Sequence, residues 1–600
     1  MDGHQKSLNQ ERAVAFVVAR LNSSRLPEKH LRRIGDQSLL AWVINNLRGC
    51  QELAEIVIAT VAEPCNEPLL AYAAREGLSC YWYEGDPDQV TTRLRRAAED
   101  FAAEICVLVS GDCPLIPGPA LDQLIRQLRC EPAGDYIWVP PDEHGREAVL
   151  EGINVARRRA WQLADDLSDT PELKEHQFPV IRLHPELFQG VAAQAPPELY
   201  GPRHRLSVDT FADLEFMNRV HEVLTAQGRA FALPEVLQLL KEEPELGRIN
   251  AHVHQRRLRE IIHPVLYVVD VGPGFGYGHL IRSQELALQL VERLGWPVTF
   301  LVDDGDAARL LLERGLPVAW GAWGRAARPA PEGRREQTVA ELLPRDGLLL
   351  LDISPREVPP GWRDELGADT PVVVLDKSEE WAQAGDLIIF PGVTAPAGKE
   401  TPAGQPGAFL KAAAKSGPQV LSGSEFIILR RDIRRLATRS RDKDLDLLAY
   451  LHRQEQREAL RNFMERHQLR GYVIGGFEPD FPQLLARSRL LVSSFGYSFY
   501  EALALETYPV VWPYSPAHRQ EARLFYARLG LPSVIIDKEN DLPDILPLLA
   551  GAGKRKITLK DGTPALVQAI FRLRERWPGY HRNEEDTDNH VLRYQRASGV

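Results

Sequence analysis

Three cations and two hydroxyl side chains fall within ten residues, directly after an apolar run at positions 13–19. They are Arg20, Ser23, Ser24, Arg25 and Lys29. Cations, hydroxyls and backbone N–H groups in one loop suit the oxygens of a polyphosphate. The alternative is a solvated surface loop, because charge clusters are usually just solvated. The position behind a buried-type strand favours phosphate binding.

Two aspartates also end predicted strands, Asp112 after 105–109 and Asp209 at the end of 205–209. The carboxyl ends of parallel strands meet at one sheet edge, so we expect both carboxylates to face the cationic loop. Together with phosphate oxygens and waters they would satisfy octahedral Mg²⁺. Such an ion neutralises charge when a nucleophile attacks an α-phosphate and pyrophosphate departs. As the alternative, Asp112 is a turn residue, since Gly-Asp is common where strands end.

A second candidate site begins at a glycine-rich loop over 271–278, which follows an apolar run and precedes a predicted helix. Glycines let the backbone approach a ligand, and the helix N-terminus favours an anion. His279 on this loop is placed to act as a general base on water, although a lone loop histidine is often only a surface residue. A dinucleotide fingerprint would have glycine at His279. Asp303 at the next strand end keeps NAD as a minor alternative.

Short β-branched runs alternate with amphipathic segments, which indicates an α/β protein with mostly parallel sheets covered by helices. In the first part, strands are expected over 13–19, 55–60, 105–109 and 205–209, and helices over 39–47 and 121–128. The alternation restarts at 265 and continues to a last predicted strand over 533–536. We predict domains at 1–250, 264–395 and 417–550, followed by a polar tail over 551–600 with one helix at 564–577.

Composition narrows the functional classes. The chain has 600 residues, more than one hydrophobic core usually organises, and its formal net charge of −11 argues against nucleic acid as a partner. Six cysteines form no CxxC pair, which disfavours a zinc site or a disulfide framework. No uninterrupted apolar run approaches a membrane span, and the start lacks an apolar signal core. We therefore expect a cytoplasmic protein.

The first site resembles the spore-coat polysaccharide cytidylyltransferases, relatives of the CMP-sialate and CMP-ketodeoxyoctulosonate synthetases. The resemblance rests on residues 19–29, 111–114 and 207–215 and covers about 13–225. It implies a Rossmann-like nucleotidyltransferase (GT-A) domain. It also implies that Arg20, Arg25 and Lys29 bind the phosphates of CTP, with Ser23 and Ser24 beside them, and that Asp112 and Asp209 hold Mg²⁺. Arg25 and Lys29 are then the catalytic cations.

The chain departs from this family at several positions. Family members usually have glycine where this chain has Asn22 and Glu28, and an acid beside the phosphates weakens their binding unless it points away. The acceptor segment is altered around 145–155, and only Lys174-Glu175-His176 keeps part of a second acceptor motif. The acceptor sugar is therefore expected to be unusual.

The second site resembles the UDP-sugar hydrolase of pseudaminic acid biosynthesis, a GT-B-fold enzyme that releases UDP from a 2,4-diacetamido sugar. The resemblance rests on its Gly-x-Gly-His-x-x-Arg signature and covers about 264–545. It implies that His279 activates water. It further implies nucleotide and sugar contacts from Gly276, Gly278, Arg282, Ser498, Glu501 and Gln520. Residues 495–497, Phe-Gly-Tyr, replace a small run that cradles the diphosphate, and bulky side chains there are expected to narrow or remodel the pocket.

Together these patterns predict a fusion of two enzymes that act in the biosynthesis of a nonulosonic-type surface sugar. One transfers a cytidylyl group from CTP to an acidic or amino sugar with Mg²⁺, and the other hydrolyses a UDP-sugar. Two alternatives remain: the second half is a glycosyltransferase, or the chain is a non-catalytic sugar-nucleotide scaffold. The sequence does not fix the oligomeric state, and a homodimer stays open.

Overall fold

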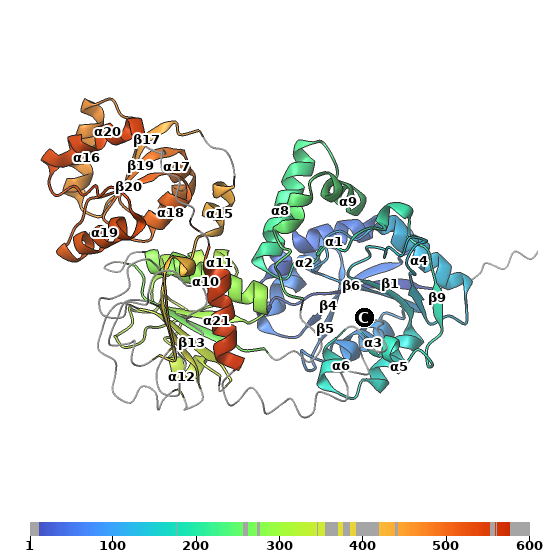
Figure 1. Cartoon of the computed structure of the whole chain (residues 1–600). Coiled ribbons are helices and arrows are strands. Elements are labelled where there is room, and N and C mark those ends of the chain that lie inside the picture. The colour runs from blue at the N-terminus through green and yellow to red at the C-terminus, as the bar shows by residue number, and fades with distance from the viewer. Residues whose placement is uncertain are drawn as a thin grey trace, which may run out of the picture. The chain divides into compact units, whose positions relative to one another are not determined.

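The computed structural model describes residues 11–176, 178–255, 262–272, 277–344, 346–353, 366, 370–375, 385–391, 419–438, 442–551, 559 and 561–575 (Figure 1). The chain divides into two compact units, one formed mainly by residues up to Ile262 and the other mainly by residues from His263. Among the described residues, none of the helices is both long and apolar enough to cross a membrane.

The first unit is organised by a seven-stranded sheet of order β5-β4-β1-β6-β8-β7-β9. Its strands are β1 Ala13–Val18, β4 Glu55–Val61, β5 Ser79–Tyr83, β6 Ile105–Ser110, β7 Tyr136–Trp138, β8 Ile153–Arg157 and β9 Gly190–Ala192. Strand β1 runs parallel to β4 and β6, whereas β8 is antiparallel to β6. Val18 lies opposite Ser110, so the loops that follow β1 and β6 start at the same level of the sheet.

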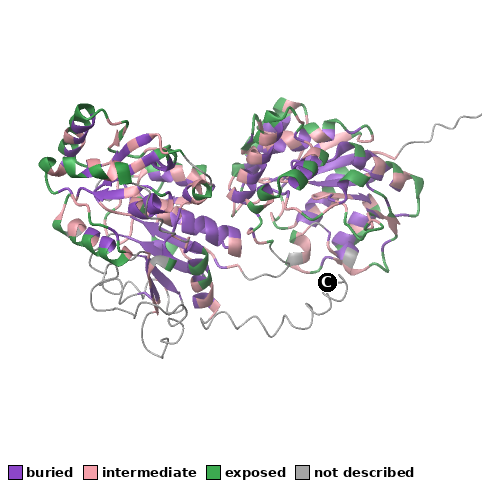
Figure 2. Cartoon of the chain, turned by 45° about the horizontal axis from the view of Figure 1, so that its top comes forward, coloured by how far each residue is buried: buried purple, intermediate pink, exposed green. Residues whose placement is uncertain are grey.

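Helices cover both faces of this sheet because successive residues of a strand point to opposite sides. On β1, Ala15 and Val17 pack with α1 Leu39–Arg48, α2 Glu67–Glu76 and α4 Gly118–Cys130. Val14 and Phe16 pack on the other face with α3 Val90–Asp100 and α5 Arg158–Leu167. Figure 2 shows the strands as buried elements. The near-continuous apolar run of β1 follows from this two-sided burial.

A third apolar cluster lies under α8 Phe211–Ala226 and α9 Leu233–Glu242. It contains Leu26 and Val208, both fully buried, from two loops that are far apart in the chain. The remaining elements of this unit are short: β2 Arg33–Ile34, β3 Gln37–Ser38, α6 Pro171–Glu175, α7 Val180–Leu183, η1 Lys29–Leu31, η2 Pro64–Asn66, η3 Pro197–Leu199 and η4 Pro244–Arg248.

The strand expected over 205–209 was wrong, because these residues form no strand. The edge of β6 that such a strand would need is already paired with β8. A backbone bond from the Val208 N–H to the Asp112 carbonyl, at 2.9 Å, ties the segment to the loop after β6. The segment therefore reaches the sheet edge as a loop that is held by the burial of Val208.

The second unit contains two parallel sheets. The larger has the order β12-β11-β10-β13-β14-β15-β16. Its strands are β10 Val265–Val269, β11 Val298–Val302, β12 Val318–Trp320, β13 Leu348–Asp352, β14 Val372–Leu375, β15 Leu387–Phe390 and β16 Gln419–Ser422. Helices α10 Gly278–Leu294, α11 Gly305–Glu313 and α12 Val339–Leu342 accompany it. Strands β13, β14 and β15 are buried along their whole length, which is typical of central parallel strands.

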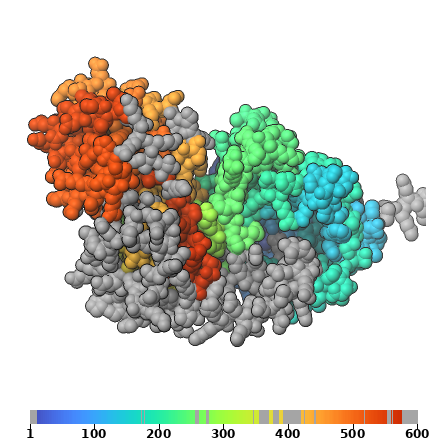
Figure 3. Space-filling view, viewed as in Figure 1, coloured from blue at the N-terminus to red at the C-terminus, as the bar shows by residue number. Residues whose placement is uncertain are grey.

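The smaller sheet has the order β18-β17-β19-β20. Its strands are β17 Leu445–Tyr450, β18 Gly471–Ile474, β19 Ser488–Ser493 and β20 Tyr508–Val511. The accompanying helices are η6 Ser424–Phe426, α15 Arg431–Ala437, α16 Gln454–Arg466, α17 Phe481–Arg487, α18 Ser498–Ala504, α19 Pro516–Leu529, η7 Glu539–Ile545 and α20 Leu546–Gly551. In the space-filling view, the orange to red residues of this region form one contiguous body of side chains (Figure 3).

Two expectations near the chain's end compare differently with the structure. The strand predicted over 533–536 is reduced to an isolated bridge between Val511 and Ile535. The predicted helix is present as α21 Thr563–Glu575, red in Figure 1. Its Arg574 donates to the Asp346 carbonyl at 3.2 Å, which ties α21 to the loop before β13.

Candidate active site

The cationic loop between β1 and η1 is held by its apolar and amide neighbours. Leu21 and Leu26 are buried, and the Leu21 N–H donates to the side-chain oxygen of buried Asn66 at 2.7 Å. The Glu28 N–H donates back to the Leu21 carbonyl at 3.0 Å, which closes the loop. The hydroxyl of Ser23 accepts from the Leu26 N–H at 3.3 Å. These contacts fix the backbone from which Arg25 and Lys29 extend.

Lys29 brings the two predicted carboxylates together. Its Nζ lies 2.6 Å from Oδ2 of Asp112 and 2.8 Å from Oδ1 of Asp209. Leu26 and Val208 share one apolar cluster, so burial of that cluster sets the distance between the cationic loop and the Asp209 loop. The two acids thus converge on a single point in front of the loop that follows β1.

Asp209 has two further cationic partners. Its Oδ2 forms an ion pair with Arg25 at 3.1 Å and accepts a hydrogen bond from Arg205 at 2.7 Å. Arg205 also donates to fully buried Asp213 at 2.8 Å. Asp213 in turn forms a capping box with Thr210 at the start of α8. Sequence reasoning assigned no role to Arg205; a cation four residues before a candidate ligand was the available signal.

The charges of this cluster reinforce one another. Burial alone would lower the pKa of Lys29, but Asp112 and Asp209 outweigh it and hold that pKa above its usual range. Burial would likewise raise the pKa of Asp209, yet the charges of Lys29, Arg25 and Arg205 keep it well below its ordinary value. Lys29 and Asp209 are therefore both charged at neutral pH.

Neighbouring His30 joins the two loops in a different way. It is buried, and its Nδ1 lies 3.0 Å from the Gly111 carbonyl. Burial, and next the charge of Lys29, lower the pKa of His30 to about 4, so the ring is neutral near pH 7. A side chain added at Gly111 would meet the His30 ring and the Val18 carbonyl. His30 therefore fixes the spacing between the loops after β1 and β6.

The donor set fits a hard divalent cation in one respect. Two carboxylate oxygens from different loops already share one cationic centre, and oxygen is the ligand that Mg²⁺ prefers. Within the described part of the chain, no group of three or more His, Cys, Asp or Glu side chains is arranged to hold a metal ion. The remaining coordination positions would have to come from phosphate oxygens and water.

The other residues predicted for this site lie at its periphery. Arg20 pairs with Asp88 at 3.1 Å, in an exposed ion pair. Ser24 is exposed. Lys174 of the partial acceptor motif donates to Asp165 on α5 at 2.8 Å rather than to the carboxylate pair.

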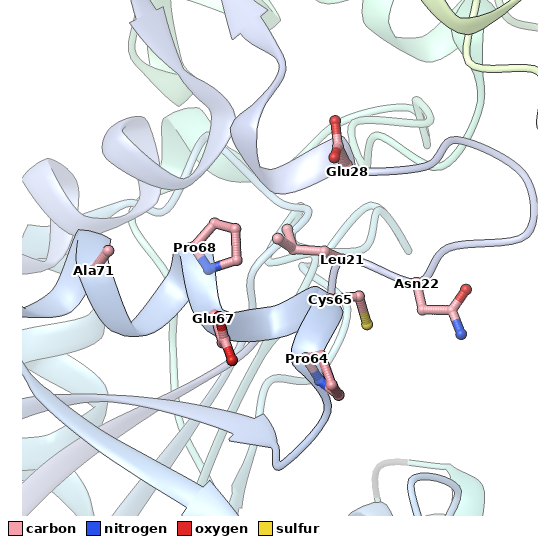
Figure 4. A pocket seen from close by; sticks show the side chains of 8 residues that line it. All are labelled: Leu21, Asn22, Glu28, Pro64, Cys65, Glu67, Pro68 and Ala71. Atoms are coloured by element: carbon pink, nitrogen blue, oxygen red, sulfur yellow. The ribbon is translucent and has the colours of Figure 1, made fainter. Parts of the chain in front are cut away.

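Glu28 adopts a φ of +56°, in the left-handed region that favours glycine. This backbone conformation explains why glycine is usual at that position in the family that the loop resembles. In Figure 4 the Glu28 carboxylate points away from Leu21 and Pro68. The Glu28 carboxylate weakens phosphate binding only if it lies close to the bound triphosphate.

A cavity of about 640 Å³ opens beside the cationic loop (Figure 4). Its lining comes from that loop and from η2 and the start of α2: Leu21, Asn22, Glu28, Pro64, Cys65, Glu67, Pro68 and Ala71. The volume lies in the range of small-molecule sites. In Figure 4 the Leu21 side chain points toward Pro68, which gives the cavity an apolar wall.

Arg93 is a second residue that the sequence reading missed. It is 1% exposed on α3, and its Nε and Nη1 have no hydrogen-bond partner among the described residues. Burial, and next the charge of Arg20, lower the pKa of Arg93 to about 10. The sequence signal for its burial was its place among the apolar residues of α3, directly before Leu94.

In the second unit, fully buried Asp352 gathers three side chains at the end of β13. Its Oδ1 lies 2.7 Å from Nδ1 of His279. Its Oδ2 accepts from Nε of Arg282 at 2.7 Å and from the Ser283 hydroxyl at 2.8 Å. Burial would raise the pKa of Asp352, but the charge of Arg282 and then that of His279 hold it below the usual range. Gly278 begins α10, and Gly276 lies outside the described residues.

The residues predicted to contact nucleotide in the region of the smaller sheet differ in how far they are buried. Both carboxylate oxygens of buried Glu501 accept from Arg430, at 2.5 and 2.6 Å. Ser498 begins α18 and is half-buried, whereas Gln520 on α19 is exposed. Asp303, the acid that the NAD alternative requires, is held by Arg325 at 2.6 Å.

Phe495 turns its ring toward the apolar core of this region. The ring is partly buried and packs against Phe499 and Phe525, with centroids 5.1 and 5.6 Å away. The expectation that residues 495–497 narrow or remodel a pocket stays a prediction. The φ of Phe495 is +91°, a glycine-like conformation, and Gly496 follows with φ +151°. The loop thus keeps a backbone that small residues would adopt while it turns the ring inward.

Comparisons with known proteins concern the first unit. Residues 14–250 match a family described as cytidylyltransferase, and the match ends there. An uncharacterized protein of Methanocaldococcus jannaschii is 23% identical over 251 residues, 41% of this chain and 98% of that protein. The spore coat polysaccharide biosynthesis protein SpsF of Bacillus subtilis is 26% identical over 239 residues, 39% of this chain and 95% of that protein.

Among solved structures, a cytidylyltransferase from Leptospira borgpetersenii is 22% identical, with a TM-score of 0.35. The alignment covers 39% of this chain and 96% of that one. The family match, the helix-covered sheet and the convergent loops agree with one another. Residues 14–250 therefore form an α/β domain whose sequence matches the cytidylyltransferase family.

Proposed function

We propose that the first unit transfers a cytidylyl group from CTP to a sugar and releases pyrophosphate. The observation that carries this proposal is the convergence of Asp112 and Asp209 on Lys29, beside Arg25. The family match supports the nucleotide, and the name of the Bacillus subtilis relative supports a role in polysaccharide biosynthesis. An acidic or amino sugar is the acceptor class that we favour.

In this proposal Asp112 and Asp209 hold Mg²⁺, which when bound supplies positive charge at the phosphate oxygens. Arg25 and Lys29 oppose the remaining charge of the triphosphate, and Arg20 adds a third cation at the rim. An acceptor hydroxyl attacks the α-phosphorus, and its proton passes to a water molecule. The bond from that phosphorus to the β-phosphate oxygen breaks, and pyrophosphate leaves in line. His30 keeps the loops that carry these groups at a fixed distance.

Pyrophosphate release from CTP in the presence of Mg²⁺ and a panel of acidic and amino sugars tests this function. The Asp112→Asn variant should lose the release, because one of two carboxylates is removed. Asp36→Asn is the matched control, since Asp36 is 76% exposed. Release by Asp112→Asn at the wild-type rate would contradict the role of this carboxylate, and no release from the wild type with any sugar would contradict the function.

We propose a second activity, hydrolysis of a UDP-sugar, for the second unit, as one GT-B-like enzyme. The specific observation is the contact between His279 and fully buried Asp352. A carboxylate at Nδ1 keeps the proton on that nitrogen, which leaves Nε2 to accept a proton from water. The water oxygen then bonds to the anomeric carbon, and UDP departs with the electrons of the broken C–O bond. The two parallel sheets support a two-lobed fold of this kind.

Release of UDP without any added acceptor separates this hydrolase from a glycosyltransferase, which needs an acceptor. Tight nucleotide binding without either product would support the scaffold alternative. We also propose a cytoplasmic location. All six cysteines are free, as is usual in a reducing compartment. A homodimer remains part of the proposal, to be tested by light scattering.

A further inference from the structure

Lys29 stands where a divalent cation would have to bind. Its ammonium nitrogen is within 2.8 Å of an oxygen from each of Asp112 and Asp209. The Lys29 side chain is 11% exposed, so the contact is largely shielded from solvent. An ion held by the same two oxygens would compete with this ammonium for one position.

The charges around this position nearly cancel. The direct ion pairs join three cations and three carboxylates: Lys29, Arg25, Arg205, Asp112, Asp209 and Asp213. Glu151 adds a fourth carboxylate near Asp112 and Arg205, and burial raises its pKa above the usual value. A divalent cation added beside Lys29 would leave an excess of positive charge in a partly desolvated space, where like charges repel strongly. Binding of the ion therefore requires either a new anion or the departure of a cation.

Lys29 is the cation that is free to leave by moving its side chain alone. Arg205 is held by Asp213 as well as by Asp209, and Arg25 binds the Oδ2 of Asp209 rather than Oδ1. The backbone of Lys29 lies in the short η1 turn, which is closed by the Leu31 N–H on the Glu28 carbonyl at 2.8 Å. A lysine carries three donors on a flexible stem and can exchange carboxylates for phosphate oxygens.

We propose that Lys29 is an exchangeable counter-ion. It fills the divalent-cation position between Asp112 and Asp209 in the nucleotide-free protein, and it moves to the phosphates when nucleotide binds. The metal ion is then admitted only together with the nucleotide. Arg25 and Arg205 keep Asp209 oriented during the exchange. The inference rests on the proposed cytidylyl transfer for the identity of the nucleotide and for the divalent-cation position between the two aspartates.

The test measures Mn²⁺ binding to the full chain by electron paramagnetic resonance, without acceptor sugar. Wild type should bind Mn²⁺ weakly at this site alone, and CTP should tighten the binding at least about tenfold, within the usual range of coupling between ligands. Lys29→Met should bind Mn²⁺ without CTP at least about tenfold more tightly than wild type. The double variant Lys29→Met/Asp112→Asn should lose that gain.

Lys241→Met is the matched control, because Lys241 is exposed on α9 and should leave Mn²⁺ binding unchanged. Circular dichroism checks that each variant is folded. Thermal unfolding gives a second readout: Mn²⁺ alone should raise the unfolding temperature of Lys29→Met more than that of wild type. Without metal, Lys29→Met leaves two carboxylates facing each other, and Mn²⁺ should relieve that repulsion.

Two results would overturn the proposal. In one, wild type binds Mn²⁺ without CTP as tightly as Lys29→Met; in the other, Lys29→Met gains no Mn²⁺ site although it is folded. Pyrophosphate release by wild type is measured in parallel. If wild type releases pyrophosphate and also binds Mn²⁺ tightly without CTP, the transferase function is supported and the exchange of Lys29 is contradicted. If Lys29→Met gains an Mn²⁺ site but wild type releases no pyrophosphate, the exchange stands and the transferase function is contradicted.

Discussion

The two candidate sites use aspartate in opposite ways. In the first unit, Asp112 and Asp209 are partly accessible and share one lysine, so their oxygens can change partner. In the second unit, Asp352 is fully buried and has two hydrogen-bonding groups at each oxygen within the fold. The first arrangement suits acids that receive a ligand. The second suits an acid that positions a histidine, an arginine and a serine.

The largest expected effects come from variants that disable one site at a time. Asp112→Asn should lower pyrophosphate release about 10²- to 10³-fold, as expected when a preorganised electrostatic contact is removed. His279→Ala should lower UDP release about 10²- to 10⁴-fold, the usual contribution of a general base. Each variant should leave the other product unchanged. Parallel assays of both products on one preparation check this, and loss of both products in either variant would contradict separate sites.

The same contrast predicts different losses of stability. Asp352→Asn leaves Arg282 without its counter-charge in a buried place, so local stability should fall by about 3–5 kcal/mol. Asp209→Asn should cost less, about 1–2 kcal/mol, because Arg205 keeps Asp213 and Lys29 keeps Asp112. Hydrogen exchange at β13 and at residues 205–215 measures each loss locally. Equal losses at the two places would show that the acids do not differ in this way.

A third effect concerns acid and His30. Its pKa is about 4 in the folded protein, below the ordinary value of about 6.5, so between these values the unfolded chain binds the proton and the folded chain does not. Stability of the first unit should therefore fall as the pH falls from about 6.5 to 4, by about 3 kcal/mol from this residue. His30→Gln should remove that dependence, as calorimetry across this pH range can show. An unchanged pH slope would contradict the prediction.

Much of the first site could be predicted because its loops follow continuous apolar runs. Strands β1 and β6 are buried on both faces and read as apolar runs, so the polar residues that directly follow them stand out in the sequence. Residues 205–209 were mistaken for a strand because a β-type run does not reveal that β8 has taken the edge of β6. Asp209 still reached the site, since the burial of Val208 directs its loop there.

Other parts of the sites depend on contacts that no local pattern carries. Arg205 and Arg93 each left a weak signal in the sequence, but only the fold reveals the ion pairs of Arg205 and the burial of Arg93. Asp352 had no assigned role because His279 lies 73 positions away along the chain. Phe495 turns inward because its ring packs on Phe499 and Phe525. The size of the side chain alone does not predict this direction.

The smallest expected effect concerns Glu28, the acid beside the cationic loop of the first unit. Glu28→Gly removes a negative charge beside the cationic loop and places glycine at a φ of +56°, which it adopts without strain. The gain of about 1 kcal/mol from relieved strain should be nearly offset by the greater freedom of glycine in the unfolded chain. Stability should thus change little, whereas the KM for CTP should fall a few-fold.

Glu67→Gln is the matched control for Glu28→Gly, since Glu67 lines the same cavity from α2, in an ordinary helical conformation. It removes one negative charge from the cavity without altering the loop that carries Lys29. If both variants lower the KM for CTP equally, the cavity's overall charge decides the affinity. A larger fall in Glu28→Gly assigns the effect to the loop itself, because only that substitution changes the backbone and charge next to the phosphate-binding cations. An unchanged KM in both would show that neither carboxylate approaches the triphosphate.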